Sequence, residues 1–194
     1  MIKGGVLALG ATLMATGGMA KDMEYKGYET PSYSVAQQME GFELRSYESH
    51  VVAEVTVRGS REGAINAGFR ELAGYIFGGN ETETKIAMTS PVMQAPLGDA
   101  WVIRFMMPSE FAASDLPEAN SDAVRFTTSP PQRFAVAQFS GRATTSELNR
   151  ELAELEDKVD LAGLKSDGPA QFLFYDSPFT MPWNRRNEVA IPLQ

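Results

Sequence analysis

Apolar and polar residues alternate with a period of two in several short stretches of the chain. The stretch 51–57 is the clearest, because valine or alanine occupies each of its odd-numbered positions. This period places successive side chains on opposite faces of an extended strand, so each stretch is predicted to be a strand. The predicted strands are 42–48, 51–57, 101–107, 134–139, 171–175 and 188–193, and the polar residues 21–37 are expected to form an extended lead-in.

Two other stretches carry apolar residues with the period of a helix. The first stripe is Ile65, Phe69, Leu72 and Ile76. Ser60 is placed to cap the N-terminus of this helix, and the glycine-rich residues 78–80 are expected to end it. The second stripe is Leu148, Leu152, Leu155 and Val159, with Thr144 or Thr145 as the cap.

The segment 85–93 separates the first helix from the strand at 101–107. Its alternation predicts a strand with Ile86, Met88 and Val92 on one face. Pro91 has no backbone N–H, so the segment is an edge strand, a bulge or a strand end. Its methionines either form the wall of a pocket for an irregular apolar ligand or fill the core.

The order of predicted elements occurs twice: strand, glycine, capped helix, glycine-rich stop, strand, proline, strand. This order predicts two β-α-β-β repeats, at about 33–107 and 124–194. Two such units would join their strands into one sheet. The expected fold is α+β, a distorted antiparallel β-barrel or curved sheet with two flanking helices, in a single domain spanning 21–194.

Composition narrows the chemistry. The sequence has 194 residues, a formal net charge of −8, one histidine and no cysteine. Thiolate metal sites, cysteine nucleophiles and disulfides are therefore excluded. The acidic charge argues against a nucleic-acid binder, which needs a basic surface. The sequence contains neither the G-x-S-x-G motif of a nucleophile elbow nor a G-x-x-x-x-G-K-[ST] phosphate loop.

Residues 1–20 have the pattern of a secretory signal peptide. Lys3 supplies the positive charge, 6–15 form a short apolar region, and 18–20 are small residues with a methionine between them. Cleavage is expected near Ala20, which would place the mature protein outside the cytoplasm, in the periplasm. The alternative is an uncleaved anchor, although the segment is short and glycine-rich for a membrane span.

Two places carry candidate site chemistry. His50 lies at the break between two predicted strands, where it is either a general base with Glu48 as one candidate partner or an exposed strand-end residue. Arg185 follows the apolar residues 179–183. Guanidinium groups beside an apolar loop suit a flat apolar ligand with carboxylate tails. The alternative is that one arginine of the pair at 185–186 holds Glu188 and the last strand.

Several motifs together resemble those of the SOUL haem-binding protein family. They lie at 78–80, 85–92, 175–178 and 184–189, in the same order as in that family, and the resemblance covers roughly 33–194. It implies the β-barrel of two repeats described above. It also implies non-covalent binding of haem or another tetrapyrrole without enzymatic turnover.

The resemblance also implies where a tetrapyrrole would lie, namely between the first helix and the loop before the last strand. The candidate binding residues are Arg61, Ala64, Gly68, Phe69, Leu72, Ile76, Phe179, Met181, Trp183 and Arg185, with Arg61 or Arg185 meeting the propionates. His50 is the single candidate axial ligand among the histidines. Two alternatives remain: a module that binds another amphipathic molecule or lipid, and a His50-dependent hydrolase.

Overall fold

The computed structural model describes residues 24–194, so the predicted signal peptide, residues 1–20, lies outside the described residues. The elements in chain order are β1 Glu24–Tyr25, β2 Tyr28–Glu29, β3 Tyr33–Met39, β4 Phe42–Tyr47, β5 His50–Arg58, α1 Arg61–Ile76, β6 Val92–Leu97, β7 Ala100–Met106, β8 Arg125–Ser129, β9 Gln132–Phe139, α2 Thr145–Leu161, β10 Gln171–Phe174, the 3-10 helix η1 Pro182–Asn184 and β11 Asn187–Leu193.

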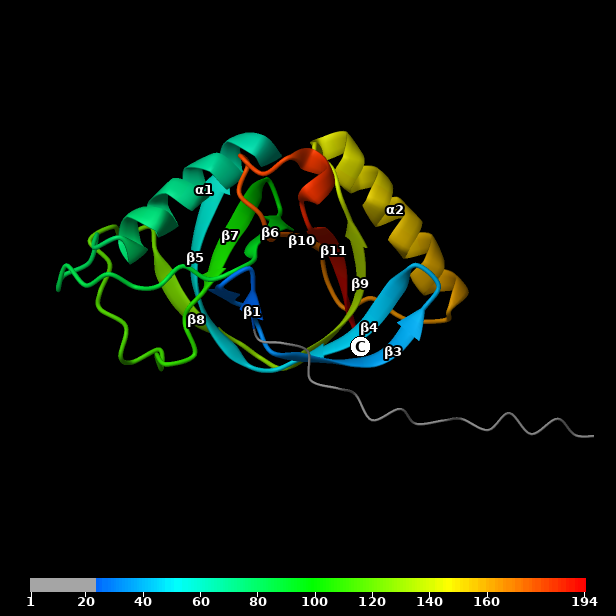
Figure 1. Ribbon diagram of the computed structural model, residues 1–194, viewed down its shortest axis with the longest axis horizontal. Coiled ribbons are helices and arrows are strands. Elements are labelled where there is room, and N and C mark those ends of the chain that lie inside the picture. Colours follow the sequence, from blue (N-terminus) through cyan, green and yellow to red (C-terminus); the bar gives the residue numbers. More distant parts are fainter. Residues whose placement is uncertain (1–23) are drawn as a thin grey trace, which may run out of the picture.

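Nine strands form one antiparallel sheet in the order β3-β4-β9-β11-β10-β6-β7-β5-β8. The sheet curls into a half-barrel, and both helices lie on the outside of the curl (Figure 1). The series β5-α1-β6-β7 fills one half and the series β9-α2-β10-β11 fills the other, with β6 and β10 paired at the centre. The predicted α+β fold with a curved antiparallel sheet and two flanking helices is confirmed.

Helix α1 packs on the sheet more closely than its apolar stripe predicted. A Cβ atom on Gly68 would lie 2.8 Å from the Cβ of Ile103, so this turn of the helix almost touches β7. The buried face therefore centres on Ala64, Gly68, Leu72 and Ile76. The predicted stripe was wrong at Phe69, which lies at the edge of the buried face: its ring contacts Phe105 of β7 edge-on but remains exposed to solvent.

Helix α2 begins as predicted. The side chain of Thr144 accepts from the backbone N–H of Glu147, and the Glu147 carboxylate accepts from the backbone N–H of Thr144, which forms a capping box. Hydrogen bonds from Thr144 lower the pKa of the Glu147 carboxyl. Leu148 and Leu155 are buried against the second half of the sheet.

Residues 85–91 are not a strand, contrary to the prediction, because their backbone groups pair elsewhere. The backbone N–H of Ile86 donates to the carbonyl of Ile76 at the end of α1, at 2.8 Å. The side chain of Thr89 donates to the carbonyl of Met106 at 2.6 Å. The ladder begins only at β6, directly after Pro91.

Strands β3 and β8 were not predicted. Both lie at the edges of the sheet. β8 has no buried residue, and β3 has only Tyr33 buried, so neither shows the alternation that reveals a half-buried strand. β3 pairs with β4 and β8 pairs with β5. These partner strands, rather than an alternating pattern of their own, determine where β3 and β8 form.

Two short links cross the open side of the half-barrel. β4 leads into β5 through residues 48–49, and β8 leads into β9 through residues 130–131. Since β4 pairs with β9 and β5 pairs with β8, both links pass from one half of the sheet to the other at one place. We call this crossing the seam; it lies at the lower edge of the curl in Figure 1.

Candidate functional site

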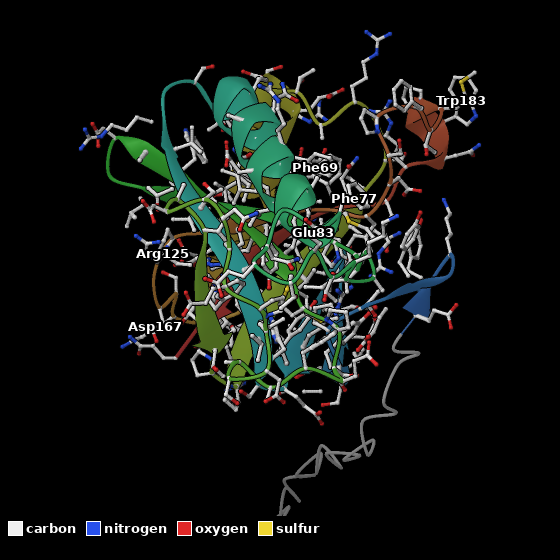
Figure 2. All side chains as sticks on the ribbon, turned by 90° about the vertical axis from the view of Figure 1, so that its left-hand side faces the viewer. Phe69, Phe77, Glu83, Arg125, Asp167 and Trp183 are labelled. Carbon is white, nitrogen blue, oxygen red and sulfur yellow. The ribbon has the colours of Figure 1, made fainter. Side chains whose placement is uncertain are left out.

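Apolar side chains of the predicted binding region are exposed on two elements. On the loop between β10 and β11, Phe179 is 95% exposed, Trp183 67% and Met181 54%. On α1, Phe69 is 42% exposed. The next residue after that helix, Phe77, was not predicted and is 66% exposed. Figure 2 shows Phe69 on α1 and Phe77 just past its C-terminal end, with Trp183 set apart on the loop.

The other predicted α1 residues face the sheet. Ala64, Leu72 and Ile76 belong to the apolar cluster between α1 and the strands β5 and β7. Gly68 is buried against Ile103. These four residues therefore support the helix from beneath, while its outward face carries Phe69.

Arg185 braces the loop that carries the exposed apolar side chains. Its Nε donates to the carbonyl of Thr180 at 2.8 Å, and its Nη2 donates to the carbonyl of Pro178 at 2.6 Å. The carbonyl of Pro182 accepts from the backbone N–H of Gly141 at 3.0 Å, which ties the loop to the start of the α2 half. The loop is thus fixed by backbone contacts while its side chains remain in water.

Arg61 lies between the N-termini of the two helices rather than on the open surface. Its Nε donates to Thr145 Oγ1 at 3.0 Å and its Nη1 donates to Gln94 Oε1 at 3.2 Å. Its Nη2 donates to Glu62 and to the carbonyl of Ala143. Only 7% of Arg61 is exposed, so its guanidinium serves mainly to join α1, β6 and α2.

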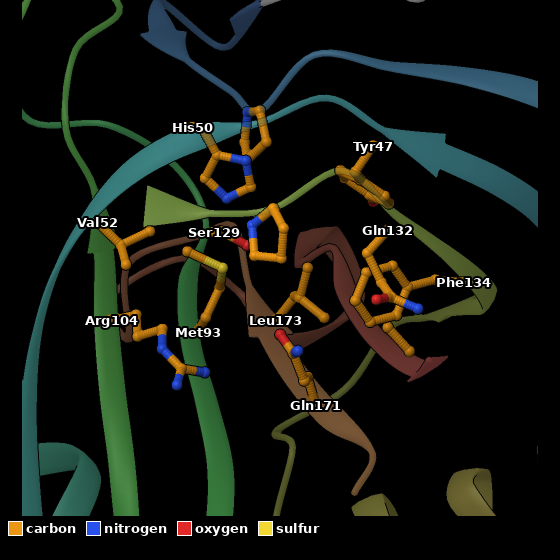
Figure 3. Close-up of a pocket in the computed structure, with 13 residues that line it drawn as sticks. Tyr47, His50, Val52, Met93, Arg104, Ser129, Gln132, Phe134, Gln171 and Leu173 are labelled. Carbon is orange, nitrogen blue, oxygen red and sulfur yellow. The ribbon is translucent and has the colours of Figure 1, made fainter. Parts of the chain in front are cut away.

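His50 is on the inner face of the sheet, at the seam. It lines a cavity of about 50 Å³ that is drawn in Figure 3. The remaining lining residues are Pro31, Tyr47, Val52, Met93, Arg104, Ser129, Pro130, Gln132, Phe134, Gln171, Leu173 and Ala190. Of the predicted site residues, His50 is the one that the cavity contains. The exposed loop lies at the opposite end of β9 and β10 (Figure 1).

The surroundings of His50 determine the protonation state of its imidazole ring. Burial lowers the pKa of the imidazole, with Arg104 lowering it further and the carbonyl of Glu48 acting in the opposite direction. The ring is therefore neutral at pH 7. Nδ1 lies 2.9 Å from the Glu48 carbonyl oxygen and donates to it, which leaves Nε2 as an acceptor.

A buried charge cluster adjoins the cavity on the inner face. The fully buried carboxylate of Glu188 accepts from Arg45 at 2.9 Å and from Arg186 at 2.6 Å. The hydroxyl of Tyr175 donates to the same carboxylate at 3.1 Å. The sequence hypothesis that one arginine of the 185–186 pair holds Glu188 is confirmed for Arg186.

Asp176 links the β1–β2 hairpin to the edge of the buried charge cluster. Burial opposes its charge, but hydrogen bonds from the backbone N–H of Arg186 and from Lys26 and Tyr25 lower its pKa below the ordinary value. Lys26 Nζ donates to it at 2.6 Å. The carboxylate therefore joins β1 to the start of the exposed loop.

Sequence reasoning missed most of the cavity. Arg104 and Tyr47 each occupy the inward position of a strand whose neighbouring residues face the helices. The sequence signal that could have revealed them is a charged or phenolic side chain at a strand position that alternates with residues facing the helices. Met93, which had been named as a pocket wall or core residue, lines the cavity and is buried.

No three acidic or histidine side chains of the described chain, 24–194, gather closely enough to hold a metal ion. No helix in this range has the length and apolar character needed to cross a bilayer.

Comparison with known families decides the relationship. The family model described as SOUL heme-binding protein matches residues 28–192. The chain belongs to the SOUL heme-binding protein family. It is 26% identical over 189 residues to Heme-binding protein 2 of Mus musculus and 28% identical over 185 residues to Heme-binding protein 2 of Homo sapiens, with 89% of each chain covered in both cases. The family and both relatives are named for haem binding.

Solved structures share the fold of this SOUL-family chain at low identity. The C-terminal domain of EcmrR has a TM-score of 0.63 at 10% identity, covering 81% of this chain and 99% of that one. A hydrolase from Listeria innocua has a TM-score of 0.58 at 11% identity, covering 81% and 94%. SAV2435 bound to tetraphenylphosphonium has a TM-score of 0.50 at 13% identity, covering 80% and 94%. These similarities concern the fold alone.

Proposed function

We propose that this SOUL-family protein binds haem or a related tetrapyrrole without a covalent link, and acts as a carrier in the periplasm after removal of residues 1–20. Family membership is the observation that carries the proposal. The Heme-binding protein 2 relatives support it across nearly the whole chain. No turnover is part of the proposal.

The residues of the outer surface fit the chemistry of a porphyrin. A porphyrin needs apolar and aromatic side chains to cover its face. Phe179, Met181 and Trp183 are such side chains, and they are exposed to solvent. Phe69 and Phe77 add a second apolar surface on α1. Because hydrogen bonds already hold the loop backbone in place, the backbone needs little further ordering when a flat ligand binds, and this favours affinity.

The cavity does not fit the macrocycle. A pocket for a drug-sized ligand measures about 300–1,000 Å³, whereas the cavity beside His50 holds about 50 Å³. His50 also lies at the opposite end of β9 and β10 from the exposed loop. We therefore propose binding through apolar contact, with Arg185 and solvent meeting the propionates and without ligation by His50.

A haemin titration of the purified chain tests the function. We expect a saturable change in the Soret absorbance and quenching of Trp183 fluorescence at micromolar haemin. The variant Trp183→Ala should weaken binding by up to about tenfold, since an aromatic contact contributes about 0.5–1.5 kcal/mol. Leu161→Ala on α2 is the matched control, because Leu161 is an equally solvent-exposed apolar residue outside the proposed surface.

The titration also separates the roles assigned to His50. A Soret change that survives in His50→Ala agrees with the apolar site, and loss of the change would transfer the site to the seam. Absence of any saturable change in the unaltered protein would overturn tetrapyrrole binding.

A second candidate is an amphipathic ligand other than a tetrapyrrole. The named complex of the fold neighbour SAV2435 with tetraphenylphosphonium supports it, because that ligand is apolar and charged. Extraction of the purified protein followed by mass spectrometry would distinguish the two, since a co-purified molecule without a tetrapyrrole absorbance would favour the second. The hydrolase alternative gains no support from His50, whose Nδ1 donates to a backbone carbonyl and not to a carboxylate.

A further inference from the structure

The seam cavity adjoins the buried charge cluster through Tyr47. Tyr47 lines the cavity, and its hydroxyl oxygen accepts a hydrogen bond from Arg45 Nη1 at 3.1 Å. Burial raises the pKa of Tyr47, so the phenol stays neutral. Figure 3 shows Tyr47 on the opposite side of the cavity from Arg104, so the charge of the lining is that of Arg104 alone.

Arg104 brings a positive charge to the same cavity. Its Nε donates to Glu54 Oε2 at 2.7 Å, which fixes the guanidinium in place. Its two Nη groups make no hydrogen bond within the described part of the chain. Figure 3 shows Arg104 beside Met93 and Val52 on one side of the cavity, with Gln132 and Phe134 on the other.

The lining contains one cationic side chain and no carboxylate. His50 is neutral and offers Nε2 as an acceptor. The carboxylate of Glu54, outside the lining, is engaged by Arg104 Nε. Ser129, Gln132 and Gln171 add neutral polar groups to the lining, and its apolar side chains are those of Val52, Met93, Phe134, Leu173 and Ala190. This lining suits a ligand that combines an anionic group with a short apolar body.

Size limits that ligand further. A water molecule needs about 10–15 Å³ of such volume, so a cavity of about 50 Å³ has room for only a few groups of that size. We propose that the seam cavity binds a short-chain aliphatic carboxylate of about the size of propionate, with Arg104 donating to the carboxylate and the apolar side chains of the lining covering the alkyl chain. This site is separate from the tetrapyrrole surface and does not depend on the proposed function.

His50 provides the readout, because it is the only histidine in the sequence. Untagged protein would be titrated with propionate at constant ionic strength while the imidazole signals of His50 are followed by NMR. We expect a saturable shift of these signals and a rise in the pKa of His50, since a bound carboxylate adds a negative charge beside Arg104. Propionamide, which has the same shape without the charge, should bind at least about tenfold more weakly.

Variants test the role of Arg104 as the donor. Arg104→Gln should weaken propionate binding by about tenfold or more. Arg58→Gln, which removes an exposed arginine of β5 outside the cavity, should leave it unchanged. Haemin added to propionate-saturated protein should leave the His50 signals in place, because the two ligands use different ends of the molecule.

Three results would overturn the proposal. The first is no saturable shift with propionate in the unaltered protein, which needs no variant to fold. The second is equal binding of propionamide, which would mean an apolar cavity without preference for an anion. The third is unchanged binding in folded Arg104→Gln.

Discussion

The outer and inner faces of the curled sheet come from the same strands but hold different chemistry. On β5 and β7, the residues that face α1 are apolar and buried, and they include Val55, Ile103 and Phe105. On the inner face, β4, β7 and β11 present Arg45, Arg104 and Glu188. An apolar face can be covered by a helix at no electrostatic cost, whereas the inner face, which mixes buried charges with apolar side chains, must satisfy those charges locally and retains a small cavity.

The two faces also expose ligand-binding chemistry in different ways. The outer side offers large apolar side chains on a braced loop, which suit a broad flat ligand. The inner side offers a small, partly open cavity with a few polar groups, which suits a small anionic one. Four changes to the sequence would test this contrast.

The largest effect is expected from Glu188→Ala on the inner face. It leaves the buried guanidinium of Arg45 and the largely buried one of Arg186 without their shared carboxylate. Removing one partner of a buried ion pair costs about 3–5 kcal/mol, and urea unfolding would measure it. Glu188→Gln keeps the shape and part of the hydrogen bonding, so a smaller loss is expected. Equal stability of Glu188→Ala and the unaltered protein would show that the charge cluster does not stabilise the inner face.

Gly68→Ala tests the outer face. The added methyl group would lie 2.8 Å from Ile103, so overpacking should cost about 1–3 kcal/mol. Gly74→Ala in the same helix is the control, because a Cβ there meets nothing within 4 Å and should stabilise the helix by up to about 1 kcal/mol. Thermal unfolding of the two variants should therefore change in opposite directions, and a shift in the same direction would contradict the close approach of α1.

Thr144→Ala tests how the second helix is attached to the outer face. It removes the side-chain oxygen of Thr144 that accepts from the backbone N–H of Glu147, with an expected loss of about 1 kcal/mol, while the bond from the Thr144 backbone N–H to the Glu147 carboxylate does not depend on this side chain. Thr145→Ala is an informative neighbour, because Thr145 bonds Arg61 rather than its own helix. The midpoint of urea denaturation gives both effects, and an unchanged midpoint in Thr144→Ala would argue against the capping box.

The smallest effect concerns the pH dependence contributed by His50. Its folded pKa lies below the unfolded value, so the unfolded chain binds the proton more readily. The contribution of His50 to the free energy of unfolding should then be fully present above the unfolded pKa of about 6.5. It should be lost as the pH decreases through the folded pKa. In His50→Gln this slope should be absent between about pH 7 and pH 5, above the range where most carboxylates titrate. An identical slope in both proteins would show that His50 is not buried as described.

Several features of this protein could be read from the sequence because local patterns express them. The capped start of α1 at Ser60 and of α2 at Thr144, and the alternation of β5 and β7, were each recognisable from neighbouring residues alone. The motifs at 85–92 and 184–189 also indicated the family that the comparison confirmed. His50 was recognised as a candidate, but not as part of a cavity.

Only the tertiary structure decided the rest. Gly68 sets which face of α1 is buried because Ile103 lies directly beneath it, and residue 103 is far away in the sequence. The cavity lies where His50 and Arg104, on the paired strands β5 and β7, face Gln132 and Phe134 of β9 in the other half of the sheet. The sequence determines where strands and helices form, since those depend on nearby residues. Which side chains face each other depends on strand pairing across the whole chain, and that is a property of the folded sheet.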